Sequence, residues 1–270
     1  MSDHSPFPGR LARLRGRLLR RFRMRAPLIF DVGANLGQDS RYYLDKGFNV
    51  VAIDADPALC EKLRQRFAAE ILRDRLRVVQ VGVGEEAGVL PFYVNEFSEW
   101  SSFNPNSKAT EQLEHRVMEL PVAPLAALIA RHGLPYYLKL DIEGFELPAI
   151  KGLGEGAALP SYLSVEVNGH WREILDRLAA LGYADFQLIR QGKEFLPQPP
   201  EPAREGHSHR LSFSNAHSGP FGRDLPDNWL PRTEIENRTQ AALTEARQRV
   251  AIGEKHGWFD IHARHAKAPR

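Results

Sequence analysis

The stretch of sequence that decides the fold reads Leu28-Ile-Phe-Asp31-Val-Gly33-Ala-Asn35-Leu-Gly37. Its apolar start predicts a buried strand over 28–32, and the pattern after Gly37 predicts a helix over 38–46. Glycines between a strand and a helix let the backbone turn tightly and let a ligand approach the peptide groups, while the helix N-terminus offers unpaired N–H donors. A second apolar strand is predicted over 49–54, so the stretch opens a βαβ unit.

The alternation of short apolar runs with amphipathic stretches continues along the chain. It predicts an α/β fold with a Rossmann-like, mainly parallel sheet of about seven strands and helices on both faces. The strands are expected over 28–32, 49–54, 76–83, 136–140, 162–167, 184–189 and 210–213, and further helices from Pro57 to 71, over 171–181 and over 233–251. Residues 89–95 are expected to be the return arm of a hairpin insertion after a turn at 85–88. The polar segment 96–110 has the length of a lid or binding loop.

Composition and charge divide the chain into three parts. The whole chain has 270 residues, 43% hydrophobic and 26% charged, as in ordinary globular proteins. Its single cysteine, Cys60, cannot form an internal disulfide, and no apolar run is long enough to cross a bilayer, so we expect a cytoplasmic protein. We expect a basic N-terminal arm over 1–26, a catalytic domain over 27–215, and a partly helical C-terminal extension over 216–270. The apolar residues near the chain's end are expected to dock on the body or on a second subunit.

The N-terminal arm has eight arginines against the single acid Asp3. Leucines and a phenylalanine recur among them at helical spacing, which predicts a basic amphipathic helix. Three interpretations are open: a helix that is solvated or docked on the body, a reversible hold on anionic membrane lipid, or a contact with nucleic acid.

Two acidic residues near the glycine turn indicate the kind of ligand. Asp31 places a carboxylate beside the turn, which suits a cationic amino acid group better than a pyrophosphate. Asp54 ends the second strand, 21 positions after Gly33, where folds of this kind bind the ribose hydroxyls of a nucleoside. Together they predict an adenosine-bearing ligand without a pyrophosphate. The alternative is a plain turn in which Asp31 caps the helix.

A second cluster reads Lys139-Leu-Asp141-Ile-Glu143-Gly144-Phe-Glu146 and follows the strand predicted over 136–140. Ligands of open α/β sheets bind at the carboxyl ends of the strands, so Asp141 and Glu143 should face the same cleft as Asp31. The alternative is an acidic start to the next helix, which favours the helix dipole. His170 follows the neighbouring strand and is either a candidate base or a solvated loop histidine.

These motifs resemble those of the FkbM-type methyltransferases, which have the class I S-adenosylmethionine-dependent fold. The resemblance covers about 28–215 and rests on the two runs quoted above, on Val51-Ala-Ile-Asp54 with Pro57, on Gly82-Val-Gly84-Glu85, and on Ser101 and Ser102. It implies S-adenosyl-L-methionine as cofactor. The implied cofactor-binding residues are Asp31, Gly33, Ala34, Asn35, Gly37, Asp54, Ala55, Val83, Gly84, Ser102 and Asp141. Members of the family commonly have Glu-Pro where this chain has Asp54-Ala55, so the ribose contact would be made by a shorter side chain.

The resemblance implies methyl transfer to a hydroxyl of a sugar, glycan or natural product. Asp141, Glu143 and His170 are the candidate catalytic residues, because a carboxylate or an imidazole can accept the proton of the attacking hydroxyl. Transfer without a metal is favoured over a divalent cation held by acids at the ends of the fourth and fifth strands.

The sequence argues against two other classes of function. A nicotinamide-dependent oxidoreductase is disfavoured by the glycine spacing. A nucleic-acid-binding or RNA-modifying protein that uses the basic arm is also disfavoured, because N6-adenine methyltransferases have an Asn or Asp followed by Pro-Pro and an aromatic residue where this chain has Asp141-Ile-Glu143-Gly144. The expected partners are a small-molecule or glycan acceptor and, through the arm, an anionic membrane surface; a homo-oligomer is left open.

Overall fold

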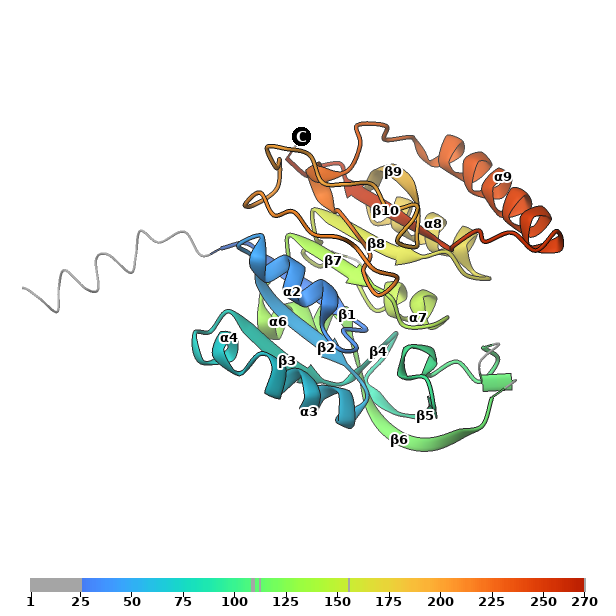
Figure 1. Ribbon diagram of the computed structural model, residues 1–270. Coiled ribbons are helices and arrows are strands. Elements are labelled where there is room, and N and C mark those ends of the chain that lie inside the picture. The colour runs from blue at the N-terminus through green and yellow to red at the C-terminus, as the bar shows by residue number, and fades with distance from the viewer. Residues whose placement is uncertain (1–25, 108–109, 112, 155, 270) are drawn as a thin grey trace, which may run out of the picture.

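The computed structural model describes residues 26–107, 110–111, 113–154 and 156–269, so the basic amphipathic helix predicted for the arm lies outside the described residues. The core is a seven-stranded sheet in the order β3-β2-β1-β7-β8-β10-β9 (Figure 1). Its strands are β1 (Leu28–Val32), β2 (Asn49–Asp54), β3 (Leu76–Gln80), β7 (Tyr137–Leu140), β8 (Tyr162–Glu166), β9 (Tyr183–Arg190) and β10 (Phe259–His265). β10 pairs antiparallel with both of its neighbours, β8 and β9, and all the other adjacent strands pair in parallel. The arrangement confirms the predicted Rossmann-like sheet of class I methyltransferases.

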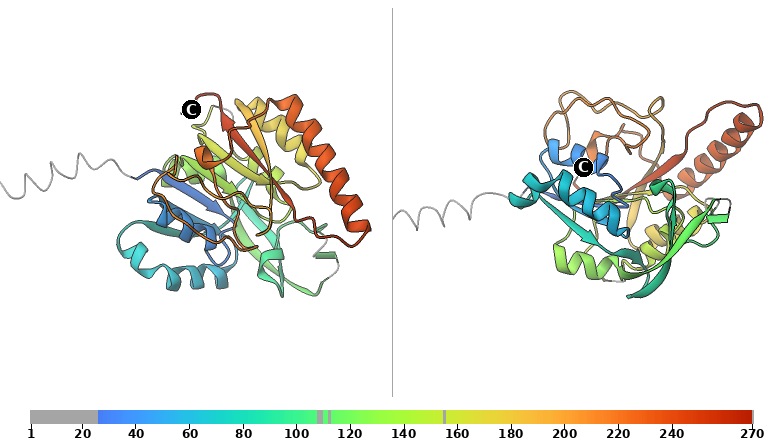
Figure 2. Two further views of the ribbon diagram at one scale, coloured as in Figure 1. Left: turned by 45° about the horizontal axis from the view of Figure 1, so that its top comes forward. Right: turned by 60° about the horizontal axis from the view of Figure 1, so that its bottom comes forward.

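Helices cover both faces of this sheet (Figure 2). Side chains that follow one another along a strand point to opposite faces, so Phe30 joins one apolar cluster and Ile29 the other. The Ile29 cluster includes α2 (Gln38–Asp45) and α3 (Pro57–Arg66), and α4 (Ala68–Leu72) follows directly. The Phe30 cluster includes α6 (Leu125–His132), α7 (Glu146–Lys151), α8 (Trp171–Ala180) and α9 (Arg232–Ala251). No helix among the described residues is both long and apolar enough to span a bilayer.

The hairpin predicted for residues 89–95 is wrong, because these residues belong to a second, smaller sheet. It has the order β4-β6-β5, with β4 (Gly82–Gly84), β5 (Gly88–Asn95) and β6 (His115–Pro124). The strand predicted over 76–83 divides at Val81 between the two sheets, and β5 pairs antiparallel with β6 rather than returning along that strand. Sequence analysis missed β6 because half of its residues are exposed and it contains Pro121, a residue that argues against a strand.

The prediction of the last strand is wrong. Residues 210–213 form no strand; Phe213 instead packs on Tyr42 of α2, with ring centroids 5.4 Å apart. The last strand is β10, which comes from the segment assigned to the C-terminal extension and lies between β8 and β9. The expected docking of the apolar end on the body is thus confirmed. The intervening segment passes over α2 and is anchored by a fully buried ion pair, in which Lys46 Nζ lies 2.6 Å from Asp224 Oδ2.

Candidate active site

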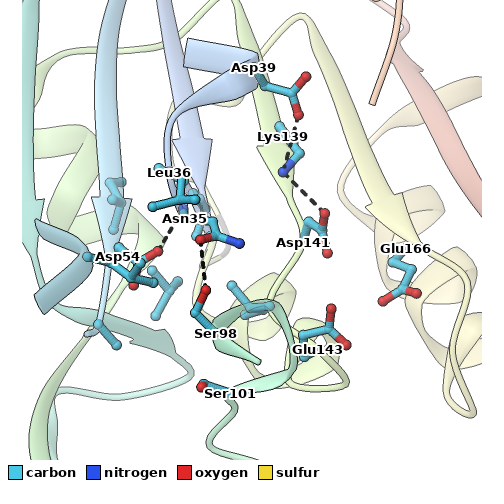
Figure 3. Close-up of a pocket in the computed structure, with 18 of the residues that line it drawn as sticks. Asn35, Leu36, Asp39, Asp54, Ser98, Ser101, Lys139, Asp141, Glu143 and Glu166 are labelled. Atoms are coloured by element: carbon cyan, nitrogen blue, oxygen red, sulfur yellow. Dashed lines mark hydrogen bonds and ion pairs between the residues drawn. The ribbon is translucent and has the colours of Figure 1, made fainter. Parts of the chain in front are cut away.

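A cleft of about 640 Å³ opens at the carboxyl ends of β1, β2, β7 and β8 (Figure 3). One wall comes from the glycine turn after β1 and from Asp54 at the end of β2. The other comes from the loop after β7, which carries Asp141 and Glu143. The short 3-10 turn Ser98–Trp100 and residues 215–218 complete the lining. The polar segment between β5 and β6 therefore borders the cleft, as its length predicted.

The glycine turn is wedged between the ends of β2 and β7. Gly33 N and Ala34 N donate to the carbonyl oxygen of Ile53 at 2.9 and 3.1 Å. A Cβ atom added at Gly33 would lie 1.8 Å from the carbonyl oxygen of Asp141, and the φ of Gly33 is +78°. Only glycine fits here, because the backbone approaches the next loop too closely for a side chain. The two motifs recognised in the sequence are thus in direct contact.

Asp54 is held rigidly at the cleft wall. Its Oδ2 accepts a hydrogen bond from Asn35 N at 2.9 Å, and its Oδ1 accepts one from Asp56 N at 3.0 Å. Burial raises the pKa of Asp54 to about 6, and these backbone hydrogen bonds partly offset the rise. Asn35 is itself fixed, because its side-chain oxygen accepts from Ser98 Oγ at 3.3 Å. The carboxylate is therefore presented to the cleft without freedom to rotate.

Lys139 is a buried cation surrounded by carboxylates. Its Nζ lies 3.2 Å from Asp141 Oδ2, 3.5 Å from Asp39 Oδ2 and 3.8 Å from Asp31 Oδ1. Burial alone would lower the pKa of Lys139, but the three carboxylates more than offset this and raise it well above its ordinary value. Burial also raises the pKa of Asp31 to about 6, although Lys139 and a 2.6 Å hydrogen bond from Ser40 Oγ oppose the rise. The lysine thus stays charged and orients Asp141 (Figure 3).

Hydrogen bonds to Glu146 and Ser102 fix the loop that carries Asp141 and Glu143, which we call the acid loop. Buried Glu146 accepts from Ile142 N at 3.0 Å and from Gly144 N at 3.2 Å, and burial raises its pKa to about 7. From the other side, Ser102 Oγ donates to the carbonyl oxygen of Glu143 at 2.8 Å. Glu143 has a φ of +56°, an uncommon conformation for a residue with a side chain. These contacts stabilise that conformation and fix the Glu143 backbone.

The cleft is strongly acidic. Among the described residues, those that line it include a single lysine and five acids, namely Asp39, Asp54, Asp141, Glu143 and Glu166. Burial and the neighbouring carboxylates raise the pKa of Glu166 well above its ordinary value. Within the described part of the chain, no group of three or more His, Cys, Asp or Glu side chains is arranged to hold a metal ion.

The structure brings most of the predicted site residues together. Those that line the cleft are Gly33, Ala34, Asn35, Asp54, Ala55, Val83, Asp141 and Glu143. Four others lie behind it: Asp31 is buried beside Lys139, Gly37 packs on α3 and Phe67, Gly84 packs on Val122, and Ser102 supports the acid loop. His170 does not line the cleft; it is exposed at the start of α8, with Nδ1 2.9 Å from Glu173 Oε1. His170 thus lies outside the cleft that Asp141 and Glu143 line.

Sequence reasoning missed the part of the cleft wall formed by residues 215–218. Ser218 donates to the Asp39 carboxylate from its backbone nitrogen at 3.0 Å and from its Oγ at 2.9 Å. These two residues lie 179 positions apart, so no local pattern could predict the contact. Trp258, just before the final strand, also lines the cleft. Lys139 belongs to a motif that was recognised in the sequence, but its ion-pair partners could be identified only from the folded structure.

The sheet order is that of a Rossmann-like fold of the class I methyltransferase type, and an acid-lined cleft lies at the carboxyl ends of its strands. Residues 31–188 match the family model described as the methyltransferase FkbM domain, and the chain belongs to that family. No curated protein matches it.

Several solved structures are similar to the chain. The FkbM methyltransferase of Methylobacillus flagellatus KT is 20% identical with a TM-score of 0.41, over 67% of this chain and 42% of that one. This chain thus spans less than half the length of that structure. The C-terminal domain of precorrin-6Y C5,15-methyltransferase from Rhodobacter capsulatus is 19% identical with a TM-score of 0.37, over 74% and 84% of the two chains. A TehB-like methyltransferase from Corynebacterium glutamicum is 15% identical with a TM-score of 0.34, over 64% and 74%.

Proposed function

We propose that this methyltransferase binds S-adenosylmethionine in the acidic cleft and transfers its methyl group to a hydroxyl of a sugar, glycan or natural product. The observation that carries the proposal is the charge of the cleft. Its described lining has five acids and a single lysine, whose charge Asp31, Asp39 and Asp141 neutralise. A ligand with a sulfonium and an ammonium group suits such a surface. The pyrophosphate of a nicotinamide cofactor or the backbone of a nucleic acid would be repelled there.

The residues around the cleft fit the parts of this cofactor. The fixed carboxylate of Asp54 can accept hydrogen bonds from the two ribose hydroxyls. Beside it, apolar side chains offer a surface for an adenine ring; they are Leu59, Val81, Val83 and Phe103. The bound cofactor supplies a methyl group on positively charged sulfur, which a nucleophile takes as the carbon–sulfur bond breaks.

The acid loop supplies what a hydroxyl nucleophile needs. A hydroxyl must lose its proton as its oxygen forms the new bond, and Asp141 and Glu143 place carboxylates at the cleft that can accept it. The ion pair with Lys139 and the Glu146 contacts hold this loop in one conformation. Positioning of donor and acceptor is the main catalytic contribution that a protein makes to a displacement of this kind.

The cofactor assignment is tested through Asp54. Asp54→Ala removes the hydrogen bonds to ribose, worth about 1–3 kcal/mol together, so S-adenosylhomocysteine should bind roughly five- to a hundredfold more weakly by calorimetric titration. Asp54→Asn should show a smaller loss because it keeps one acceptor oxygen. The matched control is Asp227→Ala, an exposed aspartate outside the cleft. Unchanged affinity in the folded Asp54 variants would remove the assignment.

The role of the segment between β5 and β6 is tested through Trp100. This indole lines the cleft, is 42% exposed, and lies in the turn that Ser98 ties to Asn35. Tryptophan fluorescence should therefore change when S-adenosylhomocysteine and an acceptor bind, and the change should be smaller in Trp100→Phe. Trp229→Phe, which removes an indole outside the cleft, should leave the change intact. A signal that persists fully in Trp100→Phe would show that this segment does not respond to ligands.

The acceptor group is tested by the product. With cofactor labelled by ¹³C in its methyl group and a panel of monosaccharides and glycosides as acceptors, the chemical shift of the transferred carbon distinguishes an ether from an amine or a thioether. Transfer to nitrogen or sulfur alone would contradict the hydroxyl assignment and leave the cofactor assignment standing.

A further inference from the structure

A second cavity adjoins the cleft. It has a volume of about 530 Å³ and is formed by residues 192–195 and by the segment 253–258 between α9 and β10. Asn215 and Trp258 line both this groove and the cleft. The two cavities therefore meet at these two side chains. Both volumes lie in the range of about 300–1,000 Å³ that is usual for ligand pockets.

Specific contacts join the two segments that form the groove. Arg190 Nε donates to the carbonyl oxygen of His256 at 2.5 Å, and its guanidinium lies 3.6 Å from the ring centroid of Phe195. Gln191 N donates to the carbonyl oxygen of Trp258 at 2.8 Å. A Cβ at Gly257 would lie 2.1 Å from the carbonyl oxygen of Gln191, which shows how closely the two segments approach. The groove is thus built by specific contacts.

The shared wall presents groups that suit a sugar. The side-chain oxygen of Asn215 accepts from Lys193 N at 3.0 Å, so this contact fixes the orientation of the amide. Among the described residues its NH₂ group has no hydrogen-bond partner, which leaves two donors for a ligand. The Trp258 indole beside it is 37% exposed. An indole offers a flat apolar surface with an N–H donor at one edge, on which a sugar ring can rest.

The charge of the groove differs from that of the cleft. Its lining includes Lys193 and Lys255, and neither ammonium has an ion-pair partner among the described residues. Of its two acids, Glu254 is already engaged by Arg249 at 3.2 Å, which leaves Glu194. An anionic group is therefore favoured in the groove, whereas the acidic cleft repels one.

We propose that this groove is an acceptor subsite, which binds an anionic glycoside whose methylated hydroxyl lies in the cleft. The inference rests on the proposed function, because the cofactor takes up much of the cleft and the rest of the acceptor must extend beyond it. The negative charge would lie near Lys193 and Lys255, and a sugar ring would pass Asn215 and Trp258. The whole groove comes from residues beyond 31–188, the part that matches the family, so this subsite is built by the chain's own C-terminal region.

The test is direct binding of simple probes to the full-length protein saturated with S-adenosylhomocysteine. Glucose 1-phosphate, glucuronic acid and neutral glucose are compared by saturation-transfer NMR at low salt. The two anions should bind more tightly than glucose, and their relative affinities distinguish a phosphate from a carboxylate. In Lys193→Ala/Lys255→Ala their binding should weaken by about three- to thirtyfold, the range for losing two exposed charge contacts, with a smaller effect at high salt.

The control is Lys267→Ala, which removes an exposed lysine at the opposite end of β10 and should change nothing. Asn215→Ala should weaken all three probes alike, because its donors serve the sugar and not the anion. Equal binding of glucose and the anions, or anion binding that is unchanged in the double lysine variant, overturns the proposal. A failure of the proposed function would be seen separately, as loss of S-adenosylhomocysteine binding by the wild-type protein.

Discussion

Asp141→Asn and Glu143→Gln are expected to lower kcat by about 10²- to 10⁴-fold, the usual contribution of a positioned proton acceptor. Each substitution keeps the shape of the side chain and removes its charge. At least one variant should keep S-adenosylhomocysteine affinity within a few fold, because the role is on the acceptor side of the cleft. Single-turnover transfer from labelled cofactor, with binding measured in parallel, separates the two effects.

A purely structural role predicts a different result for these two variants. Carboxylates that only cap the next helix would cost about 1 kcal/mol of stability and leave turnover largely intact. Glu173→Gln, which alters an exposed side chain of α8, is the control and should turn over normally, as should His170→Asn, because neither side chain lines the cleft. Near-normal kcat in both folded acid variants would contradict the catalytic role of the loop. Loss of activity with a chelator, restored by magnesium, would instead favour a cation held near Asp141.

The parallel core of the fold could be predicted from the sequence because its signals are local. Strands such as Leu28–Val32 are buried on both faces and so form short, nearly continuous apolar runs between helical patterns. The end of β2 was placed correctly at Asp54 for the same reason. The carboxyl ends of neighbouring parallel strands meet at one edge of a sheet, so the strand assignments predicted that Asp141 and Glu143 face one cleft with Asp31. The two acids line the cleft, but Asp31 is buried beside Lys139 and does not.

The prediction of the last strand was wrong because alternating apolar residues can pack on the core without belonging to the sheet. Leu211 and Phe213 alternate like strand residues, but they pack as anchors of an irregular segment on the α2 face. The strand that completes the sheet, β10, is separated from β9 by the whole of α9. Such long-range pairing has no local signature, because residues 191–258 separate the two strands.

The site shows the same division between local and distant contacts. Motif residues on one loop, such as Asp141 and Glu143, were found together. The support behind them, from Ser102 and from the Asp39–Ser218 contact, depends on segments brought together only by the fold. His170 was proposed because it follows a core strand, but a residue four positions beyond the strand's end can turn away into solvent, and here its ring pairs with Glu173.

Lys139→Met is expected to destabilise the protein by about 3–5 kcal/mol at neutral pH, because the substitution leaves buried carboxylates without their counter-charge. The loss should depend on pH. Burial already raises the pKa of Asp31 to about 6, and removing the ammonium raises that pKa further. The folded variant then binds a proton that the unfolded chain binds only at lower pH. The difference from wild type should therefore be largest near pH 8 and shrink as the pH falls toward 5.

Lys46→Met is the matched control, because Lys46 and Asp224 form a fully buried ion pair away from the cleft. Both variants should lose stability in urea unfolding, but only Lys139→Met should also weaken S-adenosylhomocysteine binding and lower kcat, since only Lys139 orients Asp141 at 3.2 Å. If the two folded variants keep the same cofactor affinity and the same kcat, Lys139 stabilises the fold without positioning the site. A destabilisation that does not change between pH 8 and pH 5 would show that the carboxylates around Lys139 do not depend on its charge.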